Sequence, residues 1–246
     1  MWVLTGDKVE TAMNIGMACK LLDNEMNIFI LQETDEKIIK EKIETYASQQ
    51  VKSKAIRDNA VVVAGETLTM IQAVKELEER FVDLCSDANV VLACRVSPKQ
   101  KAEVVNLIKN RYPEKTTLAI GDGANDVNMI NAAHIGVGIS GLEGQQAVKA
   151  SDYAIGKFKY LKNLLFVHGR ECYRRNSYAT YYILYKNVLV CTPIFTYGFL
   201  SKFSGTQIYY NLLLQAYNTV FTAFPIIWYA TNDFQFSKET LLASPG

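Results

Sequence analysis

The chain has 246 residues, with 26 basic and 25 acidic side chains, and its net charge of +1 argues against nucleic acid as a partner. Five cysteines, an odd number without close pairing, favour reduced thiols over a zinc site. The charged residues lie almost entirely before about Arg175, and the sequence that follows is apolar and aromatic. We therefore expect regions of different character within one chain.

Short apolar runs alternate with amphipathic stretches through the first 155 residues or so. We expect strands at 2–4, 28–31, 60–64, 89–94, 117–120, 135–139 and 152–155, with helices at 9–22, 33–54, 68–85 (interrupted once), 99–110 and from 127. This alternation predicts an α/β fold in which helices cover both faces of a parallel sheet. Because a strand begins at the first residues, we interpret the chain as part of a longer polypeptide.

A glycine-flanked acidic loop, Gly121–Asp126, follows one of these strands. It places the carboxylates of Asp122 and Asp126 where a parallel sheet presents its ligands, and such hard oxygen ligands suit Mg²⁺. The alternative is a turn followed by an Asn or Asp helix cap. The segments 5–7 and 97–101 also follow apolar strands, so we expect all of these loops to meet at one edge.

Beyond residue 168 the sequence has the features of a membrane protein. An arginine-rich segment precedes the apolar run 178–200, whose only charge is Lys186, and an uncharged run at 208–230 follows a polar turn. Each run is long enough to cross a bilayer, and tyrosines and tryptophan gather near the ends. These features predict a transmembrane α-helical hairpin with residues 1–177 in the cytosol; a buried pair of core helices is the alternative.

Together, Thr5–Lys8, Arg95–Lys101 and Gly121–Asp126 resemble the motifs of P-type ATPases, specifically the P4 branch, the phospholipid flippases. The resemblance covers nearly the whole chain and is weakest at 32–54. It implies a haloacid-dehalogenase-like sheet and the following organisation: a partial phosphorylation domain at 1–160, a cytosolic stalk at 161–177, membrane helices at 178–200 and 207–230, and a cytosolic segment at 231–246.

The resemblance assigns catalytic roles to residues of the acidic loop and of the preceding helix. Asp122 is expected to coordinate Mg²⁺ and Asp126 to support that metal site, since phosphoryl oxygens need a divalent cation to neutralise them. Asn125 is expected to hydrogen-bond the phosphoryl group, and Lys101 to stabilise it as a point charge. From residue type alone, Lys101 could instead belong to the solvated start of a helix.

Four further residues are expected to contact ATP or its phosphates. Thr5 and Gly6 offer hydroxyl and amide donors to phosphate oxygens. Asp7 and Arg95 belong to the same motifs and are assigned to the same cofactor-binding site. Asp7 could instead cap the helix that follows it.

The resemblance also shows what this chain lacks. In the family, an aspartate within an Asp-Lys-Thr-Gly-Thr motif accepts the ATP phosphate, and nothing in the sequence matches that motif. We expect the aspartate to lie elsewhere in the pump, so that the remaining polypeptide is a partner and this chain alone does not hydrolyse ATP. An accessory β-subunit is a further candidate partner.

Lys186 is the only charge in a run of lipid length, which makes it a functional candidate unless it snorkels to the interface. Flippases carry a Lys-Asn pair in this helix near the headgroup path, and Lys186-Asn187 matches it. In the second run, Asn211, Gln215 and Asn218 fall at helical spacing and could line that path or join the helices; Asn218 is our candidate for the path.

The sequence is compatible with several functions. An ATP-driven phospholipid translocase is our first hypothesis. A cation-transporting pump is less favoured because the two runs contain no carboxylate. A soluble haloacid-dehalogenase-type phosphatase would share the acidic loop but not the hairpin, and a degenerate membrane regulator would lack the aspartate in the full gene.

Overall fold

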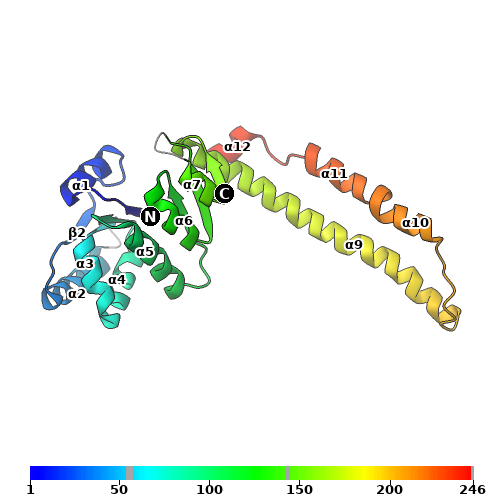
Figure 1. The fold of residues 1–246 in the computed structure, drawn as a ribbon, viewed down its shortest axis with the longest axis horizontal. Helices are drawn as coiled ribbons and strands as arrows, with labels where there is room; N and C mark the ends of the chain where they lie inside the picture. The colour runs from blue at the N-terminus through cyan, green and yellow to red at the C-terminus, as the bar shows by residue number, and fades with distance from the viewer. Residues whose placement is uncertain (54–57, 142–144, 245–246) are drawn as a thin grey trace. The chain divides into compact units, whose positions relative to one another are not determined.

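The structure, a computed structural model, describes residues 1–53, 58–141 and 145–244 (Figure 1). It forms two compact units, Met1–Lys157 and Phe158–Gly246. The first unit is α/β and the second is helical, in line with the change in composition along the sequence. Each unit is described in turn.

Parallel strands form two sheets in the first unit. The four-stranded sheet has the order β1-β4-β3-β2 and the three-stranded sheet the order β5-β6-β7. The bounds are β1 (Trp2–Leu4), β2 (Asn27–Leu31), β3 (Asn59–Ala64), β4 (Val90–Cys94), β5 (Leu118–Gly121), β6 (Ile135–Ile139) and β7 (Tyr153–Ile155). We predicted these strands as one sheet. Within the described residues, β1 and β5 each have a single partner, so each leaves one edge open.

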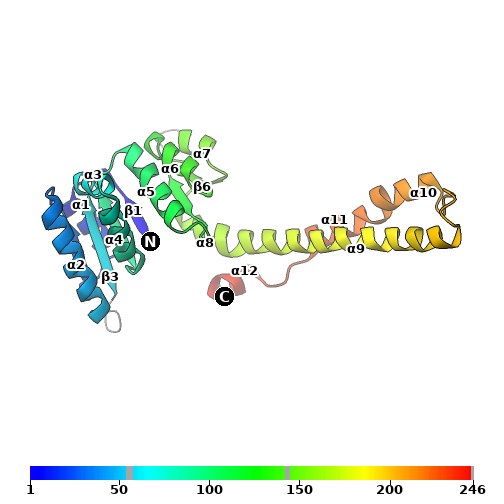
Figure 2. The same ribbon diagram turned by 90° about the horizontal axis from the view of Figure 1, so that it is seen from below.

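Helices cover both faces of the four-stranded sheet, as predicted. In β3, Val61 and Val63 pack against one layer of helices, while Ala60 and Val62 face α1 on the other side, because side chains alternate along a strand. Figure 2 shows α2, α3 and α4 along β3. The bounds are α1 (Val9–Ala18), α2 (Glu36–Ser53), α3 (Gly65–Ala73), α4 (Lys75–Ser86), α5 (Pro98–Arg111), η1 (Ala124–Asp126), α6 (Val127–Ala132) and α7 (Gln146–Ala150).

Some predicted boundaries differ from the structure. We expected a turn at residues 65–66, but α3 begins at Gly65, and it ends where Val74 adopts an extended conformation before α4. Helix α1 ends at Ala18, earlier than expected, because the chain turns back at Lys20 and buries Leu22 against the sheet. The predicted end of the second helix, Lys54, lies outside the described residues.

The second unit contains a helix of 43 residues, Phe158–Leu200, that is long and apolar enough to cross a membrane. Its parts are η2 (Phe158–Tyr160), α8 (Leu161–Asn163), η3 (Leu164–Gly169) and α9 (Arg170–Leu200). The predicted run 178–200 is therefore the later part of a longer helix. Pro193 lies inside α9 without ending it.

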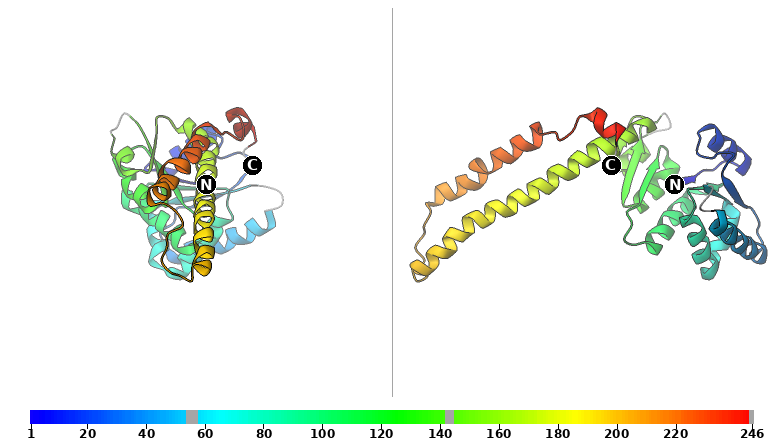
Figure 3. Two further views of the ribbon diagram at one scale, coloured as in Figure 1. Left: turned by 90° about the vertical axis from the view of Figure 1, so that its right-hand side faces the viewer. Right: turned by 180° about the vertical axis from the view of Figure 1, so that it is seen from behind.

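The second apolar run is an interrupted helix. It begins at α10 (Asn211–Ala216), continues through the π-helical turn η4 (Tyr217–Phe221) and passes Thr222 into α11 (Ala223–Asn232); α12 (Lys238–Ala243) follows. Among the described residues, no helix other than Phe158–Leu200 meets the criterion for a membrane span. We predicted a membrane helix at 207–230; in the structure the helical part of this run begins at Asn211 and is interrupted at Thr222. Figure 3 shows α10 and α11 running back beside α9.

Candidate functional site

Backbone hydrogen bonds hold the loops after β1 and β4 together. The amide of Thr5 donates to the carbonyl of Ala93 (2.9 Å), and the amide of Val96 donates to the carbonyl of Thr5 (3.1 Å). The amide of Arg95 donates to the carbonyl of Asp7 (3.0 Å). The predicted phosphate-binding residues of these loops are therefore neighbours at the carboxyl ends of their strands, where α/β sheets bind ligands.

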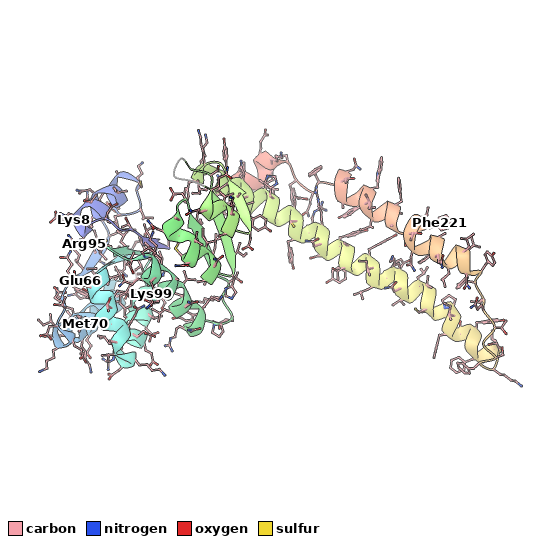
Figure 4. All side chains as sticks on the ribbon, viewed as in Figure 1. Lys8, Glu66, Met70, Arg95, Lys99 and Phe221 are labelled. Carbon is pink, nitrogen blue, oxygen red and sulfur yellow. The ribbon has the colours of Figure 1, made fainter. Side chains whose placement is uncertain are left out.

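Arg95 has a left-handed backbone, with φ of 54°, which is uncommon for a residue with a side chain. A Cβ on Gly65 would overlap the carbonyl oxygen of Arg95, so this packing requires glycine at the start of α3. Figure 4 shows Arg95 between Lys8 and Glu66, in agreement with these contacts. Such strained positions concentrate at functional sites, and this one exposes the Arg95 side chain.

The start of α5 is fixed by a capping box. The Ser97 hydroxyl accepts from the amide of Gln100 (3.3 Å), and the Gln100 side chain accepts from the amide of Ser97 (2.8 Å). Pro98 at the first turn favours the same helix start. Gln100 also donates to the carbonyl of Gly65 (2.8 Å). These contacts fix the first turn of α5, which carries Lys101.

Lys101 forms a salt bridge with Asp126, with 2.8 Å between Nζ and Oδ1. Only 13% of the Lys101 side chain and 11% of the Asp126 side chain are exposed. The other carboxylate oxygen of Asp126 accepts from the amide of Asp122 (3.3 Å). A Cβ on Gly121 would lie 2.8 Å from Cγ of Asp126, so glycine is needed for this close approach. The pair thus links α5 to the acidic loop.

Asp122 and Asn125 differ from Asp126 because both are exposed. In the described part of the chain neither side chain makes a hydrogen bond, so their oxygens are available to a ligand. Two carboxylates and an amide on one loop fit the oxygen ligands that Mg²⁺ prefers. No group of three or more His, Cys, Asp or Glu residues suited to a metal occurs in the described ranges, so further ligands would have to come from water, phosphate or another segment.

Asp7 does not cap α1, because Lys8 occupies the N-cap position. Its carboxylate instead accepts from the Thr5 hydroxyl (3.1 Å), which in turn accepts from the Asp7 amide (3.1 Å). Burial, and to a smaller extent the Asp7 carboxylate, raise the pKa of the thiol of Cys94, the last residue of β4. Gly6 lies in open space, where a Cβ would meet no atom of the described chain within 4 Å.

Lys186 contacts the interrupted helix of the second unit. Its ammonium group donates to Oδ1 of Asn218 (3.2 Å) and to the hydroxyl of Thr222 (3.3 Å). Tyr217 donates its hydroxyl to the carbonyl of Lys186 (3.2 Å). Lys186 and Asn218 therefore lie together, whereas Asn187 is exposed and its side chain makes no hydrogen bond within the described residues.

Sequence reasoning missed Thr222 and Tyr217 as members of this polar cluster. Thr222 lies four residues after Asn218, so helical spacing alone could have placed it on the same face. The structure adds the π-helical turn: the amide and the hydroxyl of Thr222 both donate to the carbonyl of Tyr217, at 3.0 and 2.7 Å. Such turns occur often at functional sites.

Comparison with known proteins agrees with both parts of this structure. Residues 10–157 match the family model of haloacid dehalogenase-like hydrolases, and residues 148–246 match the C-terminal model of phospholipid-translocating P-type ATPases. The chain belongs to the P-type phospholipid-transporting ATPases, and its first unit is haloacid-dehalogenase-like. The resemblance and fold class inferred from the sequence are thereby confirmed.

Relatives in this family match along almost the whole chain. A phospholipid-transporting ATPase of Schizosaccharomyces pombe is 46% identical over 229 residues, covering 92% of this chain and 18% of the relative. Phospholipid-transporting ATPase DRS2 of Saccharomyces cerevisiae is 44% identical over 246 residues, covering 98% and 18%. Probable phospholipid-transporting ATPase 5 of Arabidopsis thaliana is 41% identical over 258 residues, covering 100% and 21%. The chain therefore spans about a fifth of these relatives.

Proposed function

We propose that the chain is part of an ATP-driven, phospholipid-translocating P-type ATPase of a membrane. The observation that carries this proposal is the acidic loop, where Asp122 and Asn125 remain exposed beside the buried pair of Lys101 and Asp126. This arrangement offers free oxygen ligands next to a fixed positive charge. It lies on a chain that continues into a helix of membrane-spanning length.

Each residue of the acidic loop would have a different role in binding the phosphoryl group. Asp122 would hold Mg²⁺ and Asn125 would hydrogen-bond phosphate oxygens, while Asp126 keeps Lys101 and the loop in position. When bound, Mg²⁺ would neutralise the negative phosphate oxygens of ATP and of the aspartyl phosphate. Lys101 adds a positive charge that is already desolvated and oriented, which favours charge developing in the transition state.

Residues of the neighbouring loops would contact the same phosphates. Thr5 and Gly6 would supply hydroxyl and amide donors, and Gly6 has open space on the side where a Cβ would project. The exposed Arg95 would add a second positive charge, and Asp7 would keep the Thr5 hydroxyl oriented through their hydrogen bond.

The phosphorylated aspartate would come from a part of the pump outside this sequence. The open edges of β1 and β5 support this view, because each belongs to a strand whose carboxyl end leads into a predicted phosphate-binding loop. A parallel strand paired with both edges would end between Thr5–Asp7 and Gly121–Asp126. An aspartate at the end of that strand would meet all the ligands described above.

Lys186, with Asn187 and Asn218, would line the path of the lipid headgroup. The neutral partners of Lys186 leave its charge uncompensated within the described residues, which suits an anionic phosphate. The two apolar runs contain no carboxylate, which disfavours a cation pump. Residues 178–200 and 207–230 would both cross the membrane with 1–177 in the cytosol, and an accessory β-subunit would be a partner of the complete pump.

The competing functions predict different properties. A soluble phosphatase has no use for the 43-residue helix, and purification of the chain without detergent would favour it. A degenerate regulator would show no aspartate in an Asp-Lys-Thr-Gly-Thr motif in the complete gene.

The test is phosphoenzyme formation from labelled ATP by the complete pump. Replacing Asp122 with Asn should lower it by about a hundredfold or more, the scale on which removal of one key electrostatic contact acts. Asp23→Asn is the matched control, because Asp23 is exposed and remote in sequence from the motifs. Normal phosphorylation of the Asp122→Asn variant would contradict the assignment.

A further inference from the structure

A cluster of hydrogen bonds joins the start of α9 to the end of α11. We name it the clasp and define it as Glu171, Arg174, Tyr229 and Asp233. Nη1 of Arg174 donates to the hydroxyl of Tyr229 and to Oδ2 of Asp233, each at 2.9 Å. Nη2 donates to the carbonyl of Asp233 (2.8 Å) and to Oε2 of Glu171 (3.2 Å), and Nε also donates to Oε2 (3.3 Å).

Two of the charged members of the clasp, Glu171 and Arg174, are shielded from water, while Asp233 is half-exposed. The Glu171 side chain is 9% exposed and the Arg174 side chain is 21% exposed. Directly along α9, the ring of Tyr178 stacks on that of Tyr229, with centroids 4.0 Å apart. Hydrogen bonds to charged groups are strengthened in such a setting, and the bond from Arg174 lowers the pKa of Asp233.

Aromatic contacts extend the attachment beyond the clasp. The guanidinium group of Arg175 lies 4.9 Å from the ring centroid of Phe234, and that of Arg170 lies 5.5 Å from that of Phe236. Further along the chain, Leu241 of α12 is buried, and α12 contacts η3. The segment that follows α11 is therefore held against the first turns of α9.

The position of the clasp matters because the second helix is interrupted. Lys186 lies twelve residues after Arg174 on α9, about 18 Å along the axis, and bonds to Asn218 and Thr222 at the π-helical turn. The clasp fixes the other end of α11. Helix α11 is thus attached to α9 at both ends, whereas α10 lies beyond the interruption.

We propose that Arg174 is a positioning residue that, through Asp233 and Tyr229, keeps α11 in register with α9 and so keeps Asn218 and Thr222 beside Lys186. The inference rests on the proposed function, because it assigns the clasp a role in lipid handling. Movement of the long helix would then carry α11 with it. Loss of the clasp should impair the lipid-dependent steps and spare phosphorylation by ATP.

The variants must keep the protein folded. Removing Arg174 would leave the buried carboxylate of Glu171 without a hydrogen-bond donor among the described residues and with Arg175, 3.9 Å away, as its remaining ion-pair partner, which is destabilising. Asp233→Ala is milder because the Asp233 side chain is 47% exposed. Arg174→Lys keeps the charge but cannot reproduce the forked donation to Glu171 and Asp233. Glu239→Ala, an exposed acid in α12, is the matched control.

The experiment uses the complete pump in micelles with mixed phosphatidylcholine, phosphatidylethanolamine and phosphatidylserine. We expect Asp233→Ala to keep phosphoenzyme formation within about twofold and to raise the lipid concentration for half-maximal ATP turnover by about fivefold, which corresponds to the loss of one hydrogen bond of ordinary net strength at a half-exposed side chain. Arg174→Lys should fall between the wild type and Asp233→Ala, and Glu239→Ala should match the wild type.

The outcomes separate the clasp from the proposed function. Wild-type lipid dependence in Asp233→Ala would overturn the role of the clasp, and so would an equal loss of phosphorylation and turnover, which indicates a general structural role. A wild-type pump that forms no phosphoenzyme and shows no lipid-dependent turnover would overturn the proposed function, and the clasp inference with it.

Discussion

Lys101 in the first unit and Lys186 in the second are both held by hydrogen bonds, but their partners differ. Lys101 pairs with a carboxylate, so its charge is balanced within the chain. Lys186 bonds to an amide oxygen and a hydroxyl, which carry no charge. Lys101 is therefore held in place by a charged partner of the same chain, whereas the charge of Lys186 has no acidic partner among the described residues.

Breaking the Lys101 pair should have the largest effect. Asp126→Ala leaves a buried lysine without its carboxylate, and we expect a loss of about 3–5 kcal/mol in the free energy of unfolding of the first unit. Chemical denaturation followed by tryptophan fluorescence would measure it, since Trp2 lies in β1. Asp23→Ala is the control, and a loss below about 1 kcal/mol would mean that the pair is not buried in solution.

Lys186→Met should have a different effect, because no buried charge loses its partner. We expect little change in stability and about a tenfold or greater loss of lipid-dependent turnover in the complete pump, with phosphoenzyme formation retained. Lys202→Met, in the turn after α9, is the control. Unchanged lipid dependence in the Lys186→Met pump would show that this lysine does not contact the headgroup.

Thr222→Val should have a smaller effect of the same kind. The variant removes one hydrogen bond to Lys186, worth about 1 kcal/mol, so the lipid concentration for half-maximal turnover should rise by about fivefold. Thr219→Val is the matched control, because the Thr219 hydroxyl bonds to the carbonyl of Gln215. Equal effects of the two variants would mean that Thr222 does not orient Lys186.

Much of the fold around the two lysines could be predicted from the sequence. The alternation of strands and helices predicted the positions of β1, β5 and the loops after them. Short apolar runs indicate buried strands, and glycines beside them indicate tight turns. The separation into two sheets could not be predicted, since it depends on which edges find partners. The π-helical turn at Tyr217–Phe221 was also missed, because an apolar sequence carries no sign of a single wider turn.

For the candidate site, the resemblance to P-type ATPases assigned Asp122 to the metal and Asp126 to its support, but it could not give the contacts that each side chain makes. Spacing identified Asp122 and Asp126 equally as carboxylates. Only the structure shows that Asp126 is buried on Lys101 while Asp122 is exposed, a difference created by packing between α5 and the loop. The clasp at Arg174 also escaped prediction, since Arg174 and Asp233 are far apart in sequence.

A further expected difference, which concerns labelling and not lipid transport, is the reactivity of the cysteines in the two units. Cys85 and Cys94 are buried and burial raises the pKa of both thiols, whereas Cys172 at the start of α9 is exposed. At neutral pH the buried thiols hold less thiolate, so a maleimide should label Cys172 at least about tenfold faster. Mass spectrometry of time points would measure this, and equal rates would contradict the described burial.

The central claim is that these residues hold a phosphoryl group whose aspartate lies elsewhere in the pump. The most direct measurement is to label the complete pump with radioactive ATP, digest it at acid pH and identify the labelled aspartate. We predict a labelled aspartate outside these 246 residues, in an Asp-Lys-Thr-Gly-Thr motif. Label on Asp7, Asp122 or Asp126 would contradict the account.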